Sequence, residues 1–496
     1  MERLILAIDQ GTGGTKTVLF DSQGRIAAKA AHPLPSLYPQ VGFVEQDPLE
    51  IYNNVITSLR LCLDQASADT PDVLARIISA GISNQRETFL LWDDSGNPLC
   101  NAVVWQCKRS VPICEKLKGS SVEQEIRSRT GLIVDPYFSG TKLAWLMENN
   151  ATVKDAVRSG KARFGTVDTW LLYKLTRGES YFTDYTNASR TLLFNIHTLT
   201  WDAILLEAFG VDPLILPQTA PSSAHFGSSD FEGLFPHPIP ISGMIGDSHA
   251  AAFGQGCFSP GQAKATLGTG SSILCNIGGS PKPSGHGMVS TICWSTGDRV
   301  DHALEGIIVT CGATIQWLRD KLGLMASSAD TEAMARSVDS SGGVFLIPAF
   351  SGMGAPHWKM DAKASLVGLT LGSDKNHVAR AALESVAFQI KDVIMAMEED
   401  SGVPLLELKL DGGMTSNKFL MEMITDLLGV PTVTMGMEEV SALGAAYLAG
   451  LESGMFAGLD ALPSFQARAT TYVPSSAAEH IRENHATWRE MIHKHC

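Results

Sequence analysis

The chain has 496 residues, and its 38 Lys and Arg against 52 Asp and Glu give a formal net charge of −14. This length favours two large domains or three ordinary ones, and an apolar content of 44% supports buried cores and excludes a disordered chain. The net acidity argues against nucleic acid or anionic membrane as a partner, because both select clustered Lys and Arg. No apolar run approaches the length of about 18 residues that a spanning helix needs, so membrane insertion is not expected.

The cysteines and histidines point away from disulfide and metal chemistry. The nine cysteines are odd in number, scattered, and without a Cys-x-x-Cys pair, whereas disulfide frameworks and zinc sites need closer spacing. No His-Glu-x-x-His ligand pattern occurs either. We therefore expect reduced thiols in a cytoplasmic protein that is not a transition-metal enzyme.

Strand-like and helix-like patterns alternate from the first residues onward, which predicts an α/β fold. Three successive strands, joined by turns, predict a meander at the start of the chain, and the first is too short for a signal peptide. A helix that Asp47 caps and a second helix follow. These strands and helices are predicted at residues 4–8, 17–20, 25–29, 48–65 and 139–148.

The second half of the chain again shows strand-like segments around a Gly-Thr-Gly tripeptide. The segment 219–241 is rich in Pro, Ser and Gly and predicts a loop or linker, after which apolar strands resume. The tripeptide Gly-Thr-Gly stands at 11–13 and again at 268–270, flanked each time by strand-like sequence, which indicates a duplicated domain with a cleft between the copies. We place the two domains at 1–250 and 251–496. Further strands are predicted at 238–246, around 263–276 and at 405–410, and a helix at 418–428.

The first candidate site is the Gly-rich turn of residues 9–16, Asp-Gln-Gly-Thr-Gly-Gly-Thr-Lys. It matches neither a Walker A loop nor a dinucleotide fingerprint. Its glycines would let backbone N–H groups approach phosphate oxygens, and Thr12 and Lys16 would add a hydroxyl donor and a positive charge. Asp9, at the end of a strand, is suited to Mg²⁺. The alternative is an ordinary Gly-rich hairpin.

Two further loops carry acids and glycines at the ends of predicted strands. Asp247 follows Gly246 directly, which suits a general base facing a substrate hydroxyl, although local sequence alone favours a role as the cap of the helix 248–253. Residues 411–417, Asp-Gly-Gly-Met-Thr-Ser-Asn, place paired glycines at a helix start, where a flat group such as adenine could lie against the backbone. Here the alternative is a loop whose glycines serve packing alone.

Three strand-terminating Gly-rich loops with isolated acids resemble the phosphate and adenosine loops of the actin, heat-shock-70 chaperone and sugar-kinase superfamily. Within it, the chain is most similar to the FGGY carbohydrate kinases, and among these to the members that phosphorylate glycerol. The resemblance extends from about residue 4 to about residue 455. It is carried by the stretches 84–88, 101–107, 135–142, 165–170, 184–191, 303–306, 315–320, 354–358 and 442–447.

The resemblance implies two actin-like, RNase H-type α/β ATPase domains with a catalytic cleft between them, the first for polyol and phosphate and the second for the nucleotide. It implies that Arg86 and Glu87 bind polyol hydroxyls, which a forked donor beside an acceptor could do. Trp105 and Tyr137 would pack against the substrate, with Ser248 beside them, and Asp247 would be the catalytic base rather than a cap. The nucleotide set implied is Thr12, Gly13, Gly14, Lys16, Thr269, Gly312, Gln316, Gly413 and Asn417.

The expected reaction is transfer of the γ-phosphoryl group of ATP, with Mg²⁺ near Asp9, to glycerol, giving sn-glycerol 3-phosphate; we also expect a homo-oligomer. Two positions depart from the glycerol-phosphorylating pattern: Ser248 stands where glutamine is usual and Ser272 where an aromatic residue is usual. A four- or five-carbon polyol or ketose therefore stays open as an alternative substrate. A non-enzymatic ATPase switch of the actin or chaperone type is the other alternative, although it would have no use for the polyol-binding set.

Overall fold

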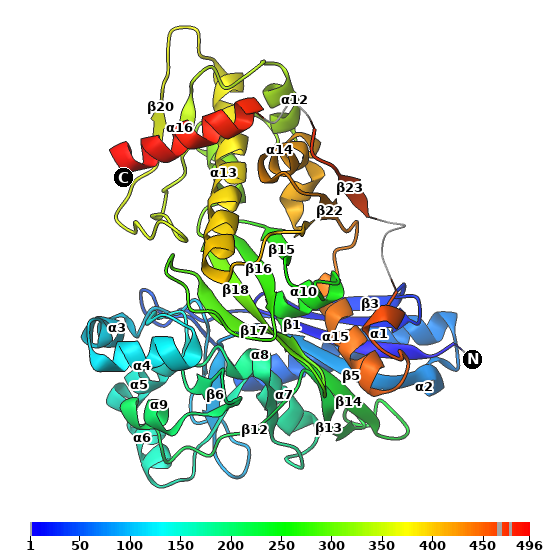
Figure 1. Ribbon diagram of the computed structural model, residues 1–496. Coiled ribbons are helices and arrows are strands. Elements are labelled where there is room, and N and C mark those ends of the chain that lie inside the picture. The colour runs from blue at the N-terminus through cyan, green and yellow to red at the C-terminus, as the bar shows by residue number, and fades with distance from the viewer. Residues whose placement is uncertain (1, 464–468, 476–478) are drawn as a thin grey trace.

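Two mixed β-sheets, one from each half of the chain, form the framework of the computed structural model, which describes residues 2–463, 469–475 and 479–496 (Figure 1). In the first sheet β1, β2 and β3 are antiparallel neighbours, while β5 and β14 continue it in parallel with β1. The predicted meander is thus confirmed. The order β13-β14-β5-β1-β2-β3 corresponds to Ser223–Ser229, Ile239–Gly246, Ile77–Asn84, Leu4–Gly11, Gly14–Asp21 and Ile26–Pro33.

The second sheet repeats the pairing of the first. Its strands β18, β16 and β15 are antiparallel neighbours, and β21 and β22 continue in parallel with β15. Each Gly-Thr-Gly tripeptide lies at the turn between the first two strands of its sheet, so the predicted duplication and the actin-like α/β architecture are confirmed. The order β17-β18-β16-β15-β21-β22-β23 corresponds to Val289–Ser295, Val300–Ile308, Ser271–Gly278, Gln262–Leu267, Glu407–Asp411, Thr432–Thr434 and Thr470–Tyr472.

One expected loop is in part a strand. The segment 219–241, predicted as loop or linker, contains β13, which pairs antiparallel with β14 at the edge of the first sheet. Its sequence, Ser-Ala-His-Phe-Gly-Ser-Ser, has little apolar alternation. The prediction was wrong because the backbone hydrogen bonds of the neighbouring strand, rather than side-chain periodicity, hold this edge in extended form.

Helices cover both sheets, and the local signals placed the first ones correctly. Helix α1 (Pro48–Asp69) begins after Asp47, whose carboxylate accepts a hydrogen bond from the Leu49 N–H at 2.8 Å, as predicted. Helix α5 (Ser139–Asn149) is also confirmed. Apart from α10, which is described below, the other helices up to residue 336 are α2 (Val73–Arg76), α3 (Val111–Leu117), α4 (Ser121–Thr130), α6 (Ala151–Arg158), α7 (Val167–Leu175), α8 (Tyr185–Ala188), α9 (Ala203–Ala208), α11 (Gly312–Asp320) and α12 (Asp330–Arg336).

Short strands complete the framework. Strands β4, β7, β6 and β8 form a four-stranded sheet, and three pairs (β9 with β12, β10 with β11, β19 with β20) stand apart. In chain order they are β4 (Glu45–Gln46), β6 (Phe89–Trp92), β7 (Ala102–Val103), β8 (Arg163–Thr166), β9 (Phe182–Asp184), β10 (Phe194–Asn195), β11 (Thr200–Trp201), β12 (Gln218–Ala220), β19 (Phe345–Ile347) and β20 (Ser365–Val367).

A helix from the last part of the chain packs on the first sheet. Helix α15 (Val440–Glu452) contacts β1, β5 and β14 and lies against α10 (Asp247–Gly254), as Figure 1 shows. The approach is close, because a Cβ atom on Gly444 would stand 1.9 Å from the backbone oxygen of Ala250. Only glycine permits this contact, which brings the start of α10 to the boundary between the two sheets.

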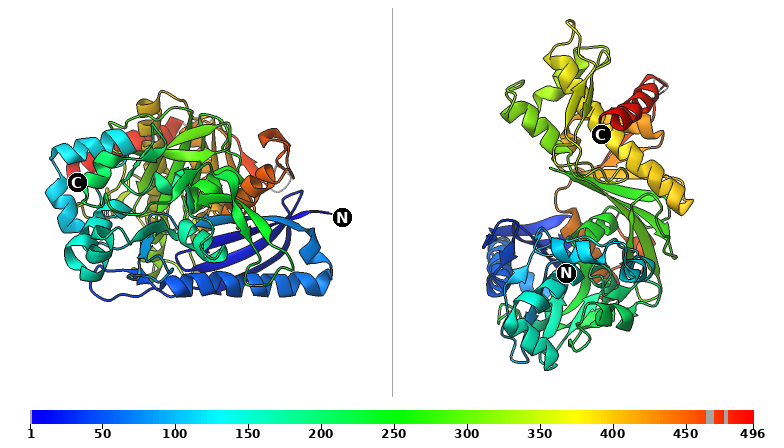
Figure 2. Two further views of the ribbon diagram at one scale, coloured as in Figure 1. Left: turned by 90° about the horizontal axis from the view of Figure 1, so that it is seen from below. Right: turned by 90° about the vertical axis from the view of Figure 1, so that its left-hand side faces the viewer.

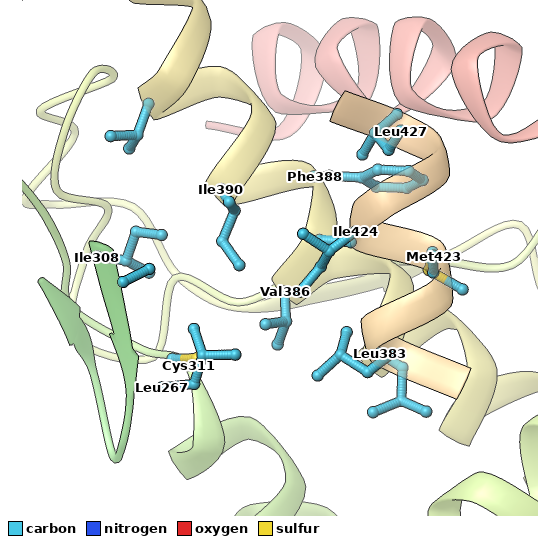
Figure 3. Packing of buried hydrophobic residues seen from close by; sticks show 14 of the residues in the cluster. Leu267, Ile308, Cys311, Leu383, Val386, Phe388, Ile390, Met423, Ile424 and Leu427 are labelled. Carbon is cyan, nitrogen blue, oxygen red and sulfur yellow. The ribbon is translucent and has the colours of Figure 1, made fainter. Parts of the chain in front are cut away.

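The lobe at the top of Figure 1, which holds the C-terminus, has its own core. Helices α13 (Lys375–Ser401), α14 (Lys418–Leu428) and α16 (Glu479–His495) pack around it, and Figure 3 shows Phe388 of α13 beside Leu427 and Ile424 of α14. The right-hand view of Figure 2 separates two lobes, with the N-terminus in one and the C-terminus in the other.

All nine cysteines are free, and seven of them are buried. Across the described residues, no helix combines the length and apolar character required to cross a membrane.

Candidate active site

A cavity of about 1020 Å³ lies between the turns of the two sheets and gathers most of the predicted site residues. It is lined by both Gly-Thr-Gly turns, by the start of α10 and by the loop that follows β21. Ten residues predicted from the sequence line it: Asp9, Thr12, Lys16, Arg86, Glu87, Trp105, Tyr137, Asp247, Ser248 and Gly413.

The other predicted residues lie beside the lining or apart from it. Gly13 lies in the turn between β1 and β2, and Gly14 begins β2. The carbonyl of Thr269 accepts hydrogen bonds from the N–H groups of Cys311 and Ala313. Gly312 donates from its N–H to the carbonyl of Gly268 at 2.9 Å, so α11 begins at the second turn.

Gln316 and Asn417, also predicted from the sequence, do not line the cavity. Gln316 is exposed one turn along α11. Asn417 caps α14, where its side chain accepts from the Leu420 N–H at 3.0 Å and donates to Thr331 at 3.1 Å. The structure therefore accounts for Asn417 as a cap without bringing it into the cavity wall.

Four buried charges alternate in sign at one end of the cavity. Arg86 Nη2 donates to Glu305 Oε1 at 2.9 Å, and Arg190 Nη1 lies 2.6 Å from Glu305 Oε2. Arg190 Nε also donates to Glu87 Oε1 at 2.5 Å. Burial raises the pKa of Glu305, but the two guanidinium groups outweigh burial and hold that pKa well below its usual value. The cluster is thus a set of paired ions that fixes Arg86 and Glu87 in place.

Sequence reasoning assigned no role to Glu305 or Arg190. Both stand in stretches that carry the resemblance, 303–306 and 184–191, yet neither follows a glycine at a strand end. Glu305 interrupts the apolar run of β18, and this was the available signal, because a charge in a buried strand requires a partner.

Asp247 presents its carboxylate to the cavity. It is the first residue of α10, but the residue before it, Gly246, occupies the cap position, so the capping alternative is wrong. Asp247 Oδ1 accepts from the Ser248 N–H at 2.6 Å and lies 3.3 Å from Arg86 Nε. With 41% of its side chain exposed, it is far more accessible than the buried Glu305.

Aromatic side chains connect this end of the cavity to the first turn. The rings of Trp105 and Tyr137 meet edge to face with centroids 5.4 Å apart, and Trp105 Nε1 donates to Thr12 Oγ1 at 2.8 Å. The guanidinium of Arg190 lies 5.7 Å from the centroid of the Tyr137 ring. Burial raises the pKa of Tyr137, so its hydroxyl stays protonated and can donate a hydrogen bond.

Asp9 and Lys16 lie on the same face of the first turn. Burial raises the pKa of Asp9 to about 6, and the hydrogen bond that Ser83 donates at 2.9 Å offsets part of that rise. Lys16 Nζ lies 2.8 Å from Glu439 Oε2. Burial lowers the pKa of Lys16, but Glu439 outweighs burial and leaves it raised, so the side chain is a cation.

The cavity wall suits a cation whose ligands are mainly substrate phosphates and water rather than protein side chains. Within the described ranges, no group of three or more His, Cys, Asp or Glu side chains is arranged to hold a metal ion. Mg²⁺ is commonly bound through one or two carboxylates together with substrate phosphates and water. A desolvated carboxylate at Asp9, facing the Gly-rich turns, fits that pattern.

Six strands of each sheet pair in the same order, both Gly-Thr-Gly turns line one cavity, and an accessible carboxylate lies beside them. These features define a two-domain α/β kinase. Residues 4–254 match the model of the FGGY family of carbohydrate kinases, N-terminal domain, and residues 263–453 match that of the C-terminal domain. The chain belongs to the FGGY family of carbohydrate kinases.

Named relatives are similar to this chain along nearly its full length. A glycerol kinase of Symbiobacterium thermophilum is 46% identical over 99% of this chain and 98% of its own, and a glycerol kinase of Desulfitobacterium hafniense is 44% identical over 99% of both chains. The crystal structure of Plasmodium falciparum glycerol kinase with ADP has a TM-score of 0.93 at 33% identity and covers 100% of this chain and 98% of that one. A ligand-bound xylulose kinase of Lactobacillus acidophilus (TM-score 0.87, 23% identity, 99% and 98% covered) has the same fold.

Proposed function

We propose that this protein transfers the γ-phosphoryl group of ATP to a primary hydroxyl of glycerol, giving sn-glycerol 3-phosphate. The observation that carries the proposal is the position of Asp247, an accessible carboxylate 3.3 Å from Arg86 in a cavity that both Gly-Thr-Gly turns line. The glycerol kinases that are 44–46% identical over nearly the whole chain support the same acceptor.

Arg86 and Glu87 bind the acceptor in this proposal. Glu305 and Arg190 neutralise and orient the pair, so little side-chain freedom is left to lose when a polyol binds. Arg86 can donate to a hydroxyl oxygen, and Glu87 has lone pairs in addition to the one that Arg190 occupies. Trp105 and Tyr137 pack against the carbon side of the polyol.

Asp247 is the general base. The N–H of Ser248 and the guanidinium of Arg86 orient its carboxylate, and its exposed part accepts the proton of the attacking hydroxyl. Phosphoryl transfer has a loose transition state, so positioning and stabilisation of charge provide most of the rate acceleration. Exclusion of water by the two lobes would suppress ATP hydrolysis.

The phosphates lie along the two turns. Lys16, Thr12 and the backbone of Gly13 and Gly14 bind from the first sheet, and Thr269 binds from the second. Asp9 would hold Mg²⁺, and the ion would neutralise charge on the phosphates. In this assignment residues 1–250 provide the acceptor and phosphate side, and 251–496 the nucleotide side through Gly312, Gln316, Gly413 and Asn417.

The rival ATPase switch is disfavoured by the acceptor end of the cavity. A switch needs the nucleotide turns alone, whereas here four paired buried charges hold Arg86 and Glu87 at the cavity wall.

We also propose that the protein acts in the cytoplasm, in keeping with its free thiols. We further propose that it assembles as a homo-oligomer.

A coupled assay of ADP release tests the proposal. ATP consumption should depend on glycerol and on Mg²⁺, and the product should be identified as sn-glycerol 3-phosphate by a stereospecific dehydrogenase. ATP turnover of equal rate with and without any polyol would contradict the proposal and favour the switch.

A further inference from the structure

A continuous chain of hydrogen bonds crosses the cavity wall beside the acceptor end. Lys264 Nζ donates to Ser248 Oγ at 2.6 Å, Ser248 Oγ lies 3.3 Å from Ser272 Oγ, and Ser272 donates to Glu305 Oε1 at 2.8 Å. Lys264, Ser248 and Ser272 all line the cavity. The chain therefore runs from a cation to an anion along a surface that a bound molecule can touch.

The two charged ends determine the direction of the hydroxyl protons. An ammonium group only donates hydrogen bonds and an ionised carboxylate only accepts them. Ser248 must then accept from Lys264 and donate to Ser272, which in turn donates to Glu305. Each serine oxygen keeps one lone pair that the chain does not use.

Lys264 adds a donor to these two acceptors. Its ammonium has three N–H groups, of which one goes to Ser248 Oγ and another to Thr266 Oγ1 at 3.1 Å. Lys264 is 1% exposed, so a polar group that approaches its remaining N–H does so from the cavity. Two fixed acceptors and a charged donor together match a hydroxyl group, which both donates and accepts.

The same wall adjoins the residues that bind the acceptor. Glu305 holds Arg86 as well as Ser272, and Ser248 follows the proposed base directly. Three elements place this wall: Ser248 is the second residue of α10, Lys264 lies in β15, and Ser272 opposes Thr266 across the hairpin of β15 and β16. A substrate held by Arg86 with its reacting hydroxyl at Asp247 would extend its further carbons toward these serines.

We propose, on the basis of the function proposed above, that Ser248 and Ser272 determine substrate choice by binding one additional hydroxyl group, so that a four-carbon polyol is a substrate alongside glycerol. Both side chains are small, which leaves room for the extra carbon. A shorter substrate would leave the two acceptors without a partner in a partly desolvated wall, which is unfavourable.

The test compares kcat/KM for glycerol, erythritol and the two threitol enantiomers in the natural protein, in Ser248→Ala, in Ser272→Ala and in the double variant. Alanine removes the hydroxyl and adds no bulk. In the natural protein, kcat/KM for at least one four-carbon polyol should be within about tenfold of kcat/KM for glycerol. Each substitution should lower the ratio of these two values (four-carbon polyol to glycerol) by about five- to tenfold, the usual effect of one lost hydrogen bond.

Ser416→Ala is the matched control, because Ser416 also lines the cavity but lies on the loop after β21. It should leave the ratio of the two kcat/KM values unchanged. The inference is overturned, while the proposed function stands, if glycerol is phosphorylated but kcat/KM for every four-carbon polyol is at least about a hundredfold lower. It is equally overturned if the serine substitutions do not change the ratio of the two kcat/KM values. Absence of turnover with all polyols, in protein that still binds ADP by calorimetry, overturns both.

Discussion

Arg86 Nη2 lies 2.9 Å from Glu305 Oε1, and this one contact joins the loop after β5 in the first sheet to strand β18 in the second. Both side chains are at most 5% exposed. The residue proposed to bind the acceptor is therefore held in place by a carboxylate more than two hundred positions away in the chain. Geometry at the acceptor site depends on how the two sheets meet.

Glu305→Ala should destabilise the fold strongly, because it removes from each of the buried guanidinium groups of Arg86 and Arg190 one of its two carboxylate partners. We expect the free energy of unfolding to fall by about 3–5 kcal/mol. Denaturant titration measures the change. The control is Glu148→Ala, since Glu148 is 54% exposed and pairs with Lys116 at the surface; it should stay within about 0.5 kcal/mol. Equal small losses in both variants would show that the buried pairing is dispensable.

Asp247→Asn should lower kcat for glycerol phosphorylation by about 10²- to 10⁴-fold, the range for loss of a general base. ADP affinity, measured by calorimetry, should change little, because the side chain faces the acceptor end of the cavity. Asp94→Asn is the control, with a surface carboxylate 62% exposed. Turnover close to that of the natural protein would remove Asp247 from the reaction.

Lys16→Met should raise KM for ATP by about 10- to 100-fold, because it removes a charge-assisted contact to a phosphate. Lys29 provides a matched comparison: its Nζ lies 3.3 Å from the same Glu439 carboxylate, but it is not a residue of the described cavity wall. Initial rates over a range of ATP concentrations separate the two lysines. If Lys29→Met raises KM as much, the effect comes from Glu439 and not from contact with the phosphates.

Asp9→Asn should stabilise the protein without ligands while it lowers activity. Burial raises the pKa of Asp9 from 3.8 to about 6, so the folded state holds the proton more tightly than the unfolded state. The natural protein therefore loses stability as pH rises from about 4 to about 6, by at most about 3 kcal/mol, and the loss is constant above that window.

Thermal unfolding of Asp9→Asn and of the natural protein between pH 4.5 and 8 measures this difference, which should grow up to about pH 6 and then level off. Mg²⁺ together with ADP should raise the melting temperature of the natural protein, and EDTA should cancel most of that gain. The variant should lose the Mg²⁺-dependent part. A variant that gains no stability at pH 7 and keeps the full Mg²⁺ effect would contradict the role given to Asp9.

Local patterns predicted much of the fold. The Asp47 cap, the opening meander and the helix at 139–148 depend on hydrogen bonds and side-chain spacing within a few residues, so they are visible in the sequence. The edge strand β13 is not, because its extended form depends on the backbone of a neighbour. The packing of α15 on the first sheet also joins segments far apart in the chain.

The sequence by itself determined the class of chemistry, since Gly-rich turns at strand ends and the acids Asp9 and Asp247 are local features that a phosphate and a base require. Local sequence alone favoured Asp247 as a cap and the family resemblance implied a base instead; the structure excludes the cap, because Gly246 occupies that position. The tertiary structure alone paired Glu305 with Arg86 and Arg190, because a buried charge is neutralised by whichever opposite charge the fold brings within a few ångströms, and no spacing along the chain specifies that partner.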